Sequence, residues 1–64
     1  MEQRSIKEWC VKRNLKYKEV AEKADVSYGT FAHWVRKPSS ISALKALRLA
    51  QIFECEVRDI IFLP

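Results

Sequence analysis

The sequence contains one glycine and two prolines, which leaves little material for the tight turns that join β-strands. It also lacks a long apolar run: the longest aliphatic or aromatic run covers residues 60–63, against about 20 residues for a bilayer span. The N-terminal stretch MEQRSIKEWC is charged throughout and has no apolar centre of the kind found in signal peptides. These absences predict a helical protein of the cytoplasm without a membrane segment.

Cysteine and histidine are also scarce. A small secreted scaffold usually carries four or more cysteines, whereas only Cys10 and Cys55 occur here, each among apolar neighbours. We interpret both as small buried hydrophobes in a reducing compartment, although a Cys10–Cys55 disulfide stays open because spacing alone does not decide it. With His33 as the one histidine and no glycine-rich loop, we expect neither an enzyme nor a metal or cofactor site.

The basic charge is unevenly distributed. The chain has 64 residues, 48% of them apolar and 31% charged, which is typical of one small globular domain spanning residues 1–64. Residues 1–37 contain nine Lys or Arg against five acidic residues, and residues 38–64 contain three of each. The net charge of +4 therefore belongs to the first half. Such an excess is typical of nucleic-acid binding, and a solvated lysine-rich surface is the alternative.

Apolar residues at helical spacing predict an all-α fold of five short helices, at residues 5–13, 17–24, 28–37, 41–53 and 57–62. The first begins with the capping-box pair Ser5 and Glu8, the third follows the N-cap residue Ser27, and the last is a helix or only a final turn. We expect Leu15 to plug the first loop. The predicted buried face of the fourth helix consists of Ile41, Leu44, Leu47, Ala50 and Phe53.

The second and third predicted helices, joined by residues 25–27, have the spacing of a helix-turn-helix. The positions where two such helices touch are all apolar: Val20, Ala21, Ala24, Val26, Phe31 and Trp34. Ala21 has the small side chain that a close helix crossing requires. The sequence therefore predicts that one face of the third helix is buried.

The opposite face of the third helix has no apolar stripe. It presents Tyr28, Gly29, His33 and Arg36, and Lys37 follows. Taken alone, His33 is either a solvated residue or a group that forms hydrogen bonds with the edges of DNA bases. Gly29 is either tolerated by a short helix, at about 0.5–1 kcal/mol relative to alanine, or lets another backbone approach closely.

The stretch YKEVAEKADVSYGTFAHWVRK, preceded by IKEWCVKRNL and followed by ISALKALRLAQIFECEVRDII, resembles the Cro/cI-like helix-turn-helix domain of phage repressors and related bacterial regulators. The resemblance covers about residues 5–62. It implies five helices around one core, with the third helix in the DNA major groove. The function it implies is that of a sequence-specific transcriptional regulator of double-stranded DNA, a Cro-like repressor that occupies an operator, of phage or prophage origin.

The resemblance also assigns residues to DNA contacts. Positions that read bases in the family correspond to Tyr28, Gly29, Thr30 and His33, with Thr30 between base and backbone. Positions that contact the DNA backbone correspond to Tyr17, Lys18, Ser27, Arg36 and Lys37. The sequence departs from the family at Asp25, where a glycine with positive φ is usual, and at Lys16, where a Ser or Thr cap is usual. Asp tolerates positive φ better than most residues do, so we expect the turn to form, with a weaker start of the second helix.

One recognition helix reads only about half a turn of DNA, and relatives use two subunits on half-sites about 34 Å apart. We therefore expect a palindromic operator and a weak homodimer, with Phe62 and Leu63 in the dimer contact; alternatively, this tail only completes the core of the monomer. No sensor domain or small-molecule effector site is evident, so regulation would depend on the concentration of the protein. The rival hypothesis is a protein-interaction module of the same fold, such as an antitoxin, an adaptor or the partner of an inhibitor.

Overall fold

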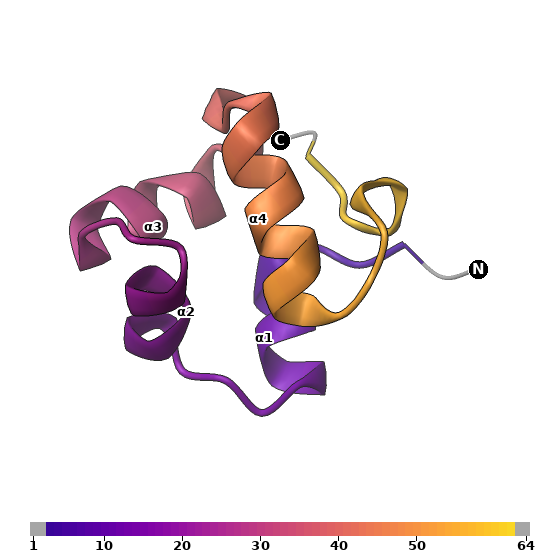
Figure 1. Ribbon diagram of the computed structural model, residues 1–64, viewed down its shortest axis with the longest axis horizontal. Helices are drawn as coiled ribbons and strands as arrows, with labels where there is room; N and C mark the ends of the chain where they lie inside the picture. Colours follow the sequence, from indigo (N-terminus) through magenta and orange to yellow (C-terminus); the bar gives the residue numbers. More distant parts are fainter. Residues whose placement is uncertain (1–2, 63–64) are drawn as a thin grey trace.

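The structure of the protein, a computed structural model, describes residues 3–62. Its helical elements follow in the order α1 (Ile6–Lys12), α2 (Tyr17–Lys23), α3 (Tyr28–Arg36), η1 (Pro38–Ser40), α4 (Ala43–Phe53) and η2 (Val57–Asp59), where η1 and η2 are single 3₁₀ turns. Helix α4 stands at the centre, with α2 and α3 on one side, the C-terminal segment on the other, and α1 at its lower end (Figure 1). The described residues contain no strand beyond one isolated bridge, between Arg4 and Ile60.

Serine side chains start three of the four α-helices. The hydroxyl oxygens of Ser5, Ser27 and Ser42 accept hydrogen bonds from the amides of Glu8, Thr30 and Lys45. Helix α2 is the exception, because its N-cap residue Lys16 makes no such bond. Its start is held instead by Glu19, whose carboxylate accepts from the Lys16 amide at 3.0 Å. The predicted capping pair Ser5–Glu8 is therefore confirmed, and the weaker start of α2 stays a prediction.

The chain leaves α1, α2 and α4 in the same way, through a left-handed residue that is not glycine. These residues are Asn14 (φ 55°), Asp25 (φ 59°) and Glu54 (φ 56°). After each one, the next amide bonds to a carbonyl five residues back, in the pairs Leu15–Cys10, Val26–Ala21 and Cys55–Ala50, at 2.8, 3.0 and 2.9 Å. This is the Schellman motif, in which the residue after the left-handed one packs an apolar side chain against the helix.

The Schellman motifs explain the apolar residues of the loops. Leu15, Val26 and Cys55 are each half-buried and pack against the core. The predicted role of Leu15 as a plug is confirmed, and the expected positive φ at Asp25 is confirmed as well.

The core takes side chains from all four α-helices and from the C-terminal segment. Its largest fully buried members are Phe31, Phe53, Ile6, Leu49 and Val20. The ring of Trp9 stacks on Phe53 at a centroid distance of 6.2 Å, and this contact joins α1 to α4. Of the contact positions predicted for the helix-turn-helix, Val26 is half-buried and the other five are buried, which confirms the crossing of α2 and α3.

The prediction of five helices is wrong, because the described chain has four α-helices, and the alternative of a final turn is confirmed. Residues 57–59 form one 3₁₀ turn, after which Ile60 continues in an extended conformation. The backbone there bonds to the N-terminal segment: the Arg4 amide donates to the Asp59 carbonyl at 3.0 Å, and the Ile61 amide donates to the Arg4 carbonyl at 2.9 Å. The indole N–H of Trp9 also donates to the Asp59 carbonyl, at 2.9 Å. These long-range bonds replace the ones that a helix would have formed.

The predicted buried face of α4 is also wrong in part, because Leu44 and Leu47 are 80% and 54% exposed. A strict repeat of three residues falls about 60° short of a full helical turn at each step, so it winds around the helix. The face that packs on the core follows mixed spacings of three and four residues and consists of Ala46, Leu49, Ala50 and Phe53. The two leucines therefore lie on the outer surface of α4.

We predict that Glu54→Gly stabilises the protein. Glycine adopts positive φ without the steric penalty that a side chain pays there, so we expect a gain of about 0.5–1 kcal/mol in the free energy of unfolding. Gln51→Gly, an exposed position within α4, is the matched control and should cost about 1 kcal/mol. Urea unfolding followed by circular dichroism measures both variants. A loss of stability in Glu54→Gly would contradict the left-handed conformation at this residue.

Candidate nucleic-acid interface

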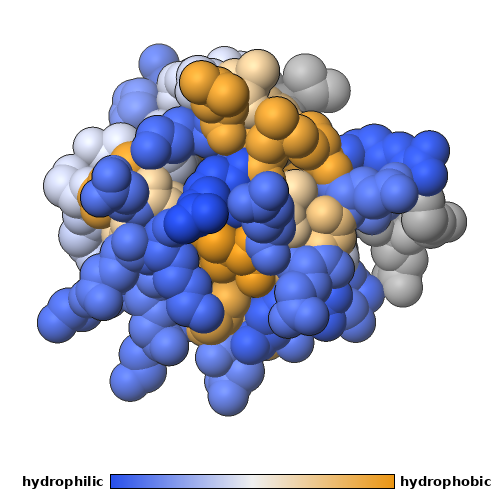
Figure 2. Space-filling view, viewed as in Figure 1, coloured by the Kyte–Doolittle hydropathy of each residue, from blue (hydrophilic) through white to orange (hydrophobic). Residues whose placement is uncertain are grey.

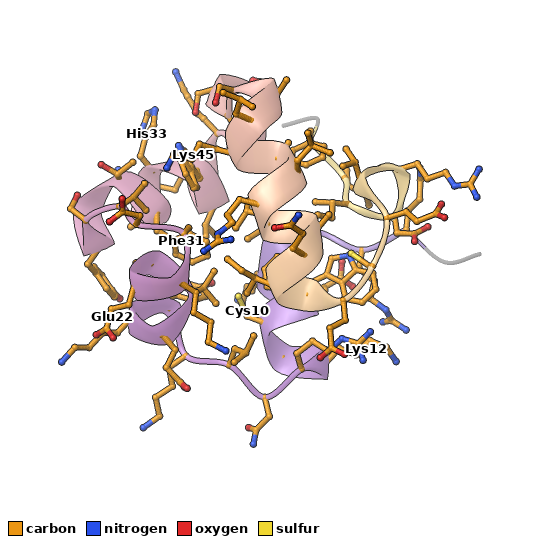
Figure 3. The ribbon with its side chains drawn as sticks, in the orientation of Figure 1. Cys10, Lys12, Glu22, Phe31, His33 and Lys45 are labelled. Carbon is orange, nitrogen blue, oxygen red and sulfur yellow. The ribbon has the colours of Figure 1, made fainter. Side chains whose placement is uncertain are left out.

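Helix α3 is held by one face only. Phe31 is fully buried and Trp34 is 7% exposed, and their rings meet edge to face at a centroid distance of 6.3 Å. In Figure 3, Phe31 points into the molecule from α3, whereas His33 points away from it. The packing of the inner face therefore presents the outer face of a nine-residue helix to solvent.

The predicted site residues of α3 share this outer surface. Tyr28 is 57% exposed, and the others are exposed as well: Gly29, Thr30, His33, Arg36 and, just after the helix, Lys37. Residues 28–37 contain no acidic side chain. The outer surface of α3 thus combines an aromatic ring, an imidazole and two cations without a carboxylate among them.

Ser27 and Thr30 organise the first turn of α3. The Ser27 hydroxyl accepts from the Thr30 amide at 3.1 Å and donates to the Thr30 hydroxyl oxygen at 2.9 Å. The Ser27 hydroxyl therefore caps α3, as the sequence predicts. The second predicted role of Ser27, a contact with the DNA backbone, stays a prediction. The first amides of any α-helix, here those of Tyr28 and Gly29, have no partner within the helix and lie at the positive end of its dipole.

Gly29 is not required by the fold. Its φ is not positive, so its backbone conformation is open to any residue. No heavy atom lies within 4 Å of the position that a β-carbon would take. The described part of the chain therefore gives no packing reason for a glycine, although glycine lowers helix stability.

Tyr17 differs from the other predicted contact residues, because its ring belongs partly to the core. The ring is half-buried and meets Phe31 edge to face at a centroid distance of 5.3 Å. Burial raises the pKa of the Tyr17 hydroxyl, and the nearby Cys10 and Tyr28 raise it further. The contact of the Tyr17 ring with Phe31 packs the start of α2 against α3. Lys18, the next residue of α2, is exposed as expected.

A shallow hollow of about 370 Å³ lies at the C-terminal end of α3 and is lined by His33, Arg36 and Lys37. The backbone of Lys37 is fixed on both sides: its amide donates to the His33 carbonyl at 2.7 Å, and its carbonyl accepts from the Ser40 hydroxyl at 2.7 Å. Cations at the C-terminal end of a helix are also favoured by its dipole. The hollow is a basic surface that is open to solvent.

Sequence reasoning missed three cations that connect helices. Arg13 Nε donates to the Phe53 carbonyl at 2.6 Å, Lys45 Nζ donates to the Ala24 carbonyl at 3.0 Å, and Arg48 Nε donates to the Lys23 carbonyl at 3.1 Å. They bind the last carbonyls of α4 and α2, which lack partners within those helices. No local pattern reveals them, because each pair is 21 or more residues apart in the sequence.

Both cysteines are free, so the disulfide alternative is wrong. Burial raises the pKa of the Cys10 thiol to about 11 and also raises that of the half-buried Cys55. Within residues 3–62, no three His, Cys, Asp or Glu side chains are grouped so that they could hold a metal ion. None of the helices in this range is long and apolar enough to span a membrane.

Comparisons with known proteins gave one finding. Neither a search of curated proteins nor a search of solved structures returned a match. The model of the helix-turn-helix family HTH_3 matches residues 6–60, which include every helical element of the structure. The match spans most of the chain, and it agrees with the buried crossing of α2 and α3 and with the exposed outer surface of α3. The protein belongs to the XRE-type helix-turn-helix family of DNA-binding regulators.

Proposed function

We propose that the protein is a sequence-specific regulator of transcription, a Cro-like repressor that occupies an operator with α3 in the major groove of duplex DNA. The observation that carries this proposal is the outer surface of α3, which is exposed to solvent, contains no acidic side chain and ends in the cations Arg36 and Lys37. The major groove is about 12 Å wide and admits a single α-helix. No step of this function needs a catalytic group or a cofactor.

The exposed side chains divide into two roles by their place along α3. Tyr28, Thr30 and His33, on the first two turns, are the proposed readers of base edges. Lys18 of α2 and the pair Arg36 and Lys37 are the proposed partners of phosphates, which attract cations whatever the base sequence. Gly29 would let the backbone of the first turn approach the DNA.

Two subunits on a palindromic operator complete the proposal. The molecule measures 30 × 23 × 18 Å, so one subunit is small enough to occupy one half-site of a repeat of about 34 Å. Of the predicted dimer contacts, Phe62 is half-buried against the core and Leu63 lies outside the described residues. The level of the protein itself would then regulate occupancy, in the cytoplasm of a bacterium or a phage-infected cell.

Selection of bound sequences from random duplexes by the purified protein tests the proposal directly. We expect enrichment of one palindromic sequence. Enrichment of no sequence, together with no binding to duplex DNA at low salt, would contradict it and favour the protein-interaction module.

Lys37→Ala should weaken binding to all duplexes alike. The logarithm of the binding constant should fall with the logarithm of salt concentration, with a slope of about −0.9 for each phosphate neutralised, and this substitution should flatten the slope by about one unit. Lys12→Ala is the control, since Lys12 is exposed on α1, on the opposite side of the molecule from His33 (Figure 3). Fluorescence anisotropy at several salt concentrations measures both. An equal effect of the two substitutions would contradict the phosphate contact.

His33→Ala should act on specificity, with the selected operator as the reference. A lost base contact costs about 1–3 kcal/mol on the operator and much less on random DNA, so the ratio of the two affinities should fall by about 5- to 150-fold. The same anisotropy assay, with duplexes changed at one base pair at a time, identifies the position that His33 reads. Equal losses on operator and random DNA would mean that it reads none.

Gly29→Ala separates stability from binding. Because a β-carbon meets nothing there and alanine favours helices, we expect the free energy of unfolding to rise by about 0.5–1 kcal/mol. If the backbone approaches DNA closely at this residue, the same methyl group should lower operator affinity. Thermal unfolding and anisotropy are measured on one preparation. A more stable variant with unchanged affinity would show that close approach is not the reason for the glycine.

A further inference from the structure

The outer surface of α1 contains a hollow of about 560 Å³, which we call the α1 hollow. Its walls are formed by α1 and by the segment just before it, with the side chains of Arg4, Lys7, Glu8, Val11 and Lys12. In Figure 3, Lys12 and His33 lie on opposite sides of the molecule. The α1 hollow therefore lies away from the proposed DNA-binding surface of α3.

Val11 is the residue of the α1 hollow that the fold does not explain. Its side chain is 74% exposed, because α1 packs on the core through Ile6, Trp9 and Cys10. A β-branched residue also lowers helix propensity, and α1 is only seven residues long. Valine at this position therefore gains no burial within the described chain and weakens the helix.

Arg4 and Glu8, at the N-terminal end of the α1 hollow, are both engaged within the protein. The Glu8 carboxylate accepts a hydrogen bond from the Ser5 amide at 2.9 Å. This bond lowers the pKa of the carboxyl, and the charge of Arg4 lowers it further. The Arg4 guanidinium lies over the ring of Trp9, at 5.9 Å from the centroid. The opposite charges of Arg4 and Glu8 offset each other, so together they add little net charge to the hollow.

Lys7 and Lys12 provide the excess positive charge of the α1 hollow. Neither side chain forms an ion pair or a hydrogen bond within residues 3–62. On the helix surface the two lysines flank Val11, at about 40° on one side and about 100° on the other. Hydrophilic side chains also predominate over the lower part of the molecule, where α1 and α2 lie (Figure 2). The valine is thus an apolar group between two cations.

The α1 hollow differs in chemistry from the hollow at the end of α3. The hollow at the end of α3 is lined by His33, Arg36 and Lys37 and includes no apolar side chain, which suits the phosphates of DNA. In the α1 hollow, the valine and the aliphatic stems of the lysines provide apolar surface as well as charge. A phosphate backbone would leave this apolar surface without a partner, whereas a polypeptide supplies apolar and acidic side chains together.

We propose that the α1 hollow binds an acidic segment of another protein, which places one apolar side chain on Val11 and carboxylates beside Lys7 and Lys12. Interfaces of this kind have an apolar centre and a polar rim. Charge distinguishes such a partner from a second copy of the chain, because the same surface of a second copy would bring lysines against lysines. An acidic segment is instead attracted by both lysines and by the net charge of +4.

The position of the α1 hollow allows DNA and the acidic partner to be bound at the same time. A partner beside Lys12 leaves His33 and the rest of the outer surface of α3 uncovered (Figure 3). The site would then bring an acidic protein to the operator. This consequence rests on the proposed function, but binding of the acidic segment does not.

Nuclear magnetic resonance of the ¹⁵N-labelled full chain tests the site with a synthetic peptide that has one leucine between two runs of four glutamates. We expect saturable changes of the amide shifts, largest in residues 7–12. The dissociation constant should be about 0.1–1 mM, because the contact is small. Changes centred on α3, or changes that do not saturate, would overturn the proposal.

Replacing the leucine of the peptide by serine tests the apolar contact. The serine peptide should bind about fivefold more weakly, because it buries less apolar surface. Val11→Thr keeps the branched shape of the side chain, so it should weaken the leucine peptide by a similar factor and leave the affinity for the serine peptide unchanged. An equal effect of Val11→Thr on both peptides would mean that Val11 does not contact the leucine, and the proposal would be wrong.

Charge reversal tests the contribution of the lysines. Lys7→Glu should weaken binding of the leucine peptide by about tenfold, since it places a carboxylate against carboxylates. Lys23→Glu is the matched control, because Lys23 is exposed on α2 outside both proposed surfaces and the net charge changes by the same amount. We expect less than a twofold effect there, and circular dichroism confirms that both variants fold. An equal loss in the two variants would mean that only net charge attracts the peptide, which contradicts a site on α1.

The two proposals fail separately. Peptide binding to α1 by a protein that binds no duplex would refute the proposed function and support the docking site. Duplex binding through α3 without saturable peptide binding would refute the docking site alone. A short duplex that shifts the amides of residues 7–12 rather than those of α3 would refute both, because it would assign α1 to DNA.

Discussion

The carbonyls at the C-terminal ends of α1, α2 and α4 constrain this fold more than any single packing contact does. An α-helix leaves its last four carbonyls without internal partners, and α1 and α2 are only seven residues long. Most of their backbone would therefore be unsatisfied if each helix stood alone. Schellman motifs close all three ends, and cations from distant segments bind further carbonyls at two of them. At the ends of α2 and α4, the backbone is therefore completed by side chains from other parts of the fold.

This constraint decides which charges remain for a partner. Arg13, Lys45 and Arg48 are used within the protein, and Arg13 also lies over the ring of Trp9 at 5.4 Å. Arg36 and Lys37 lie at the end of α3, on the surface that the packing of Phe31 presents to solvent. Net charge alone does not distinguish the two groups. The charge relevant to DNA is therefore more localised than the excess of basic residues in the first half suggests.

Local features were predictable from the sequence because the interactions behind them join near neighbours. The capping pair of Ser5 and Glu8, the N-cap role of Ser27 and the turn at Asp25 each depend on residues a few positions apart. The crossing of α2 and α3 was predictable for a similar reason: a short turn fixes which positions of the two helices meet, and only apolar side chains such as Phe31 suit them. These local signals also defined the outer surface of α3, and with it the candidate site.

Only the tertiary structure decided the features that depend on partners far along the chain. The conformation of residues 57–62 is set by backbone bonds to Arg4, more than 50 residues away, which a short apolar segment forms in place of a helix. Packing on the core decides which side of α4 is buried, and this leaves Leu44 and Leu47 exposed. The spacing of three residues in the sequence did not identify the buried side, because such a repeat winds around the helix. The hydrogen bond from Arg13 to the Phe53 carbonyl of α4 likewise cannot be predicted from neighbouring residues in the sequence. Sequence alone determined where the four α-helices form and which faces of the helix-turn-helix meet, because short-range geometry dictates both. The side chains that bind the helix ends, and the side of α4 that is buried, were decided by the whole fold, because the groups involved come together only when the chain has packed.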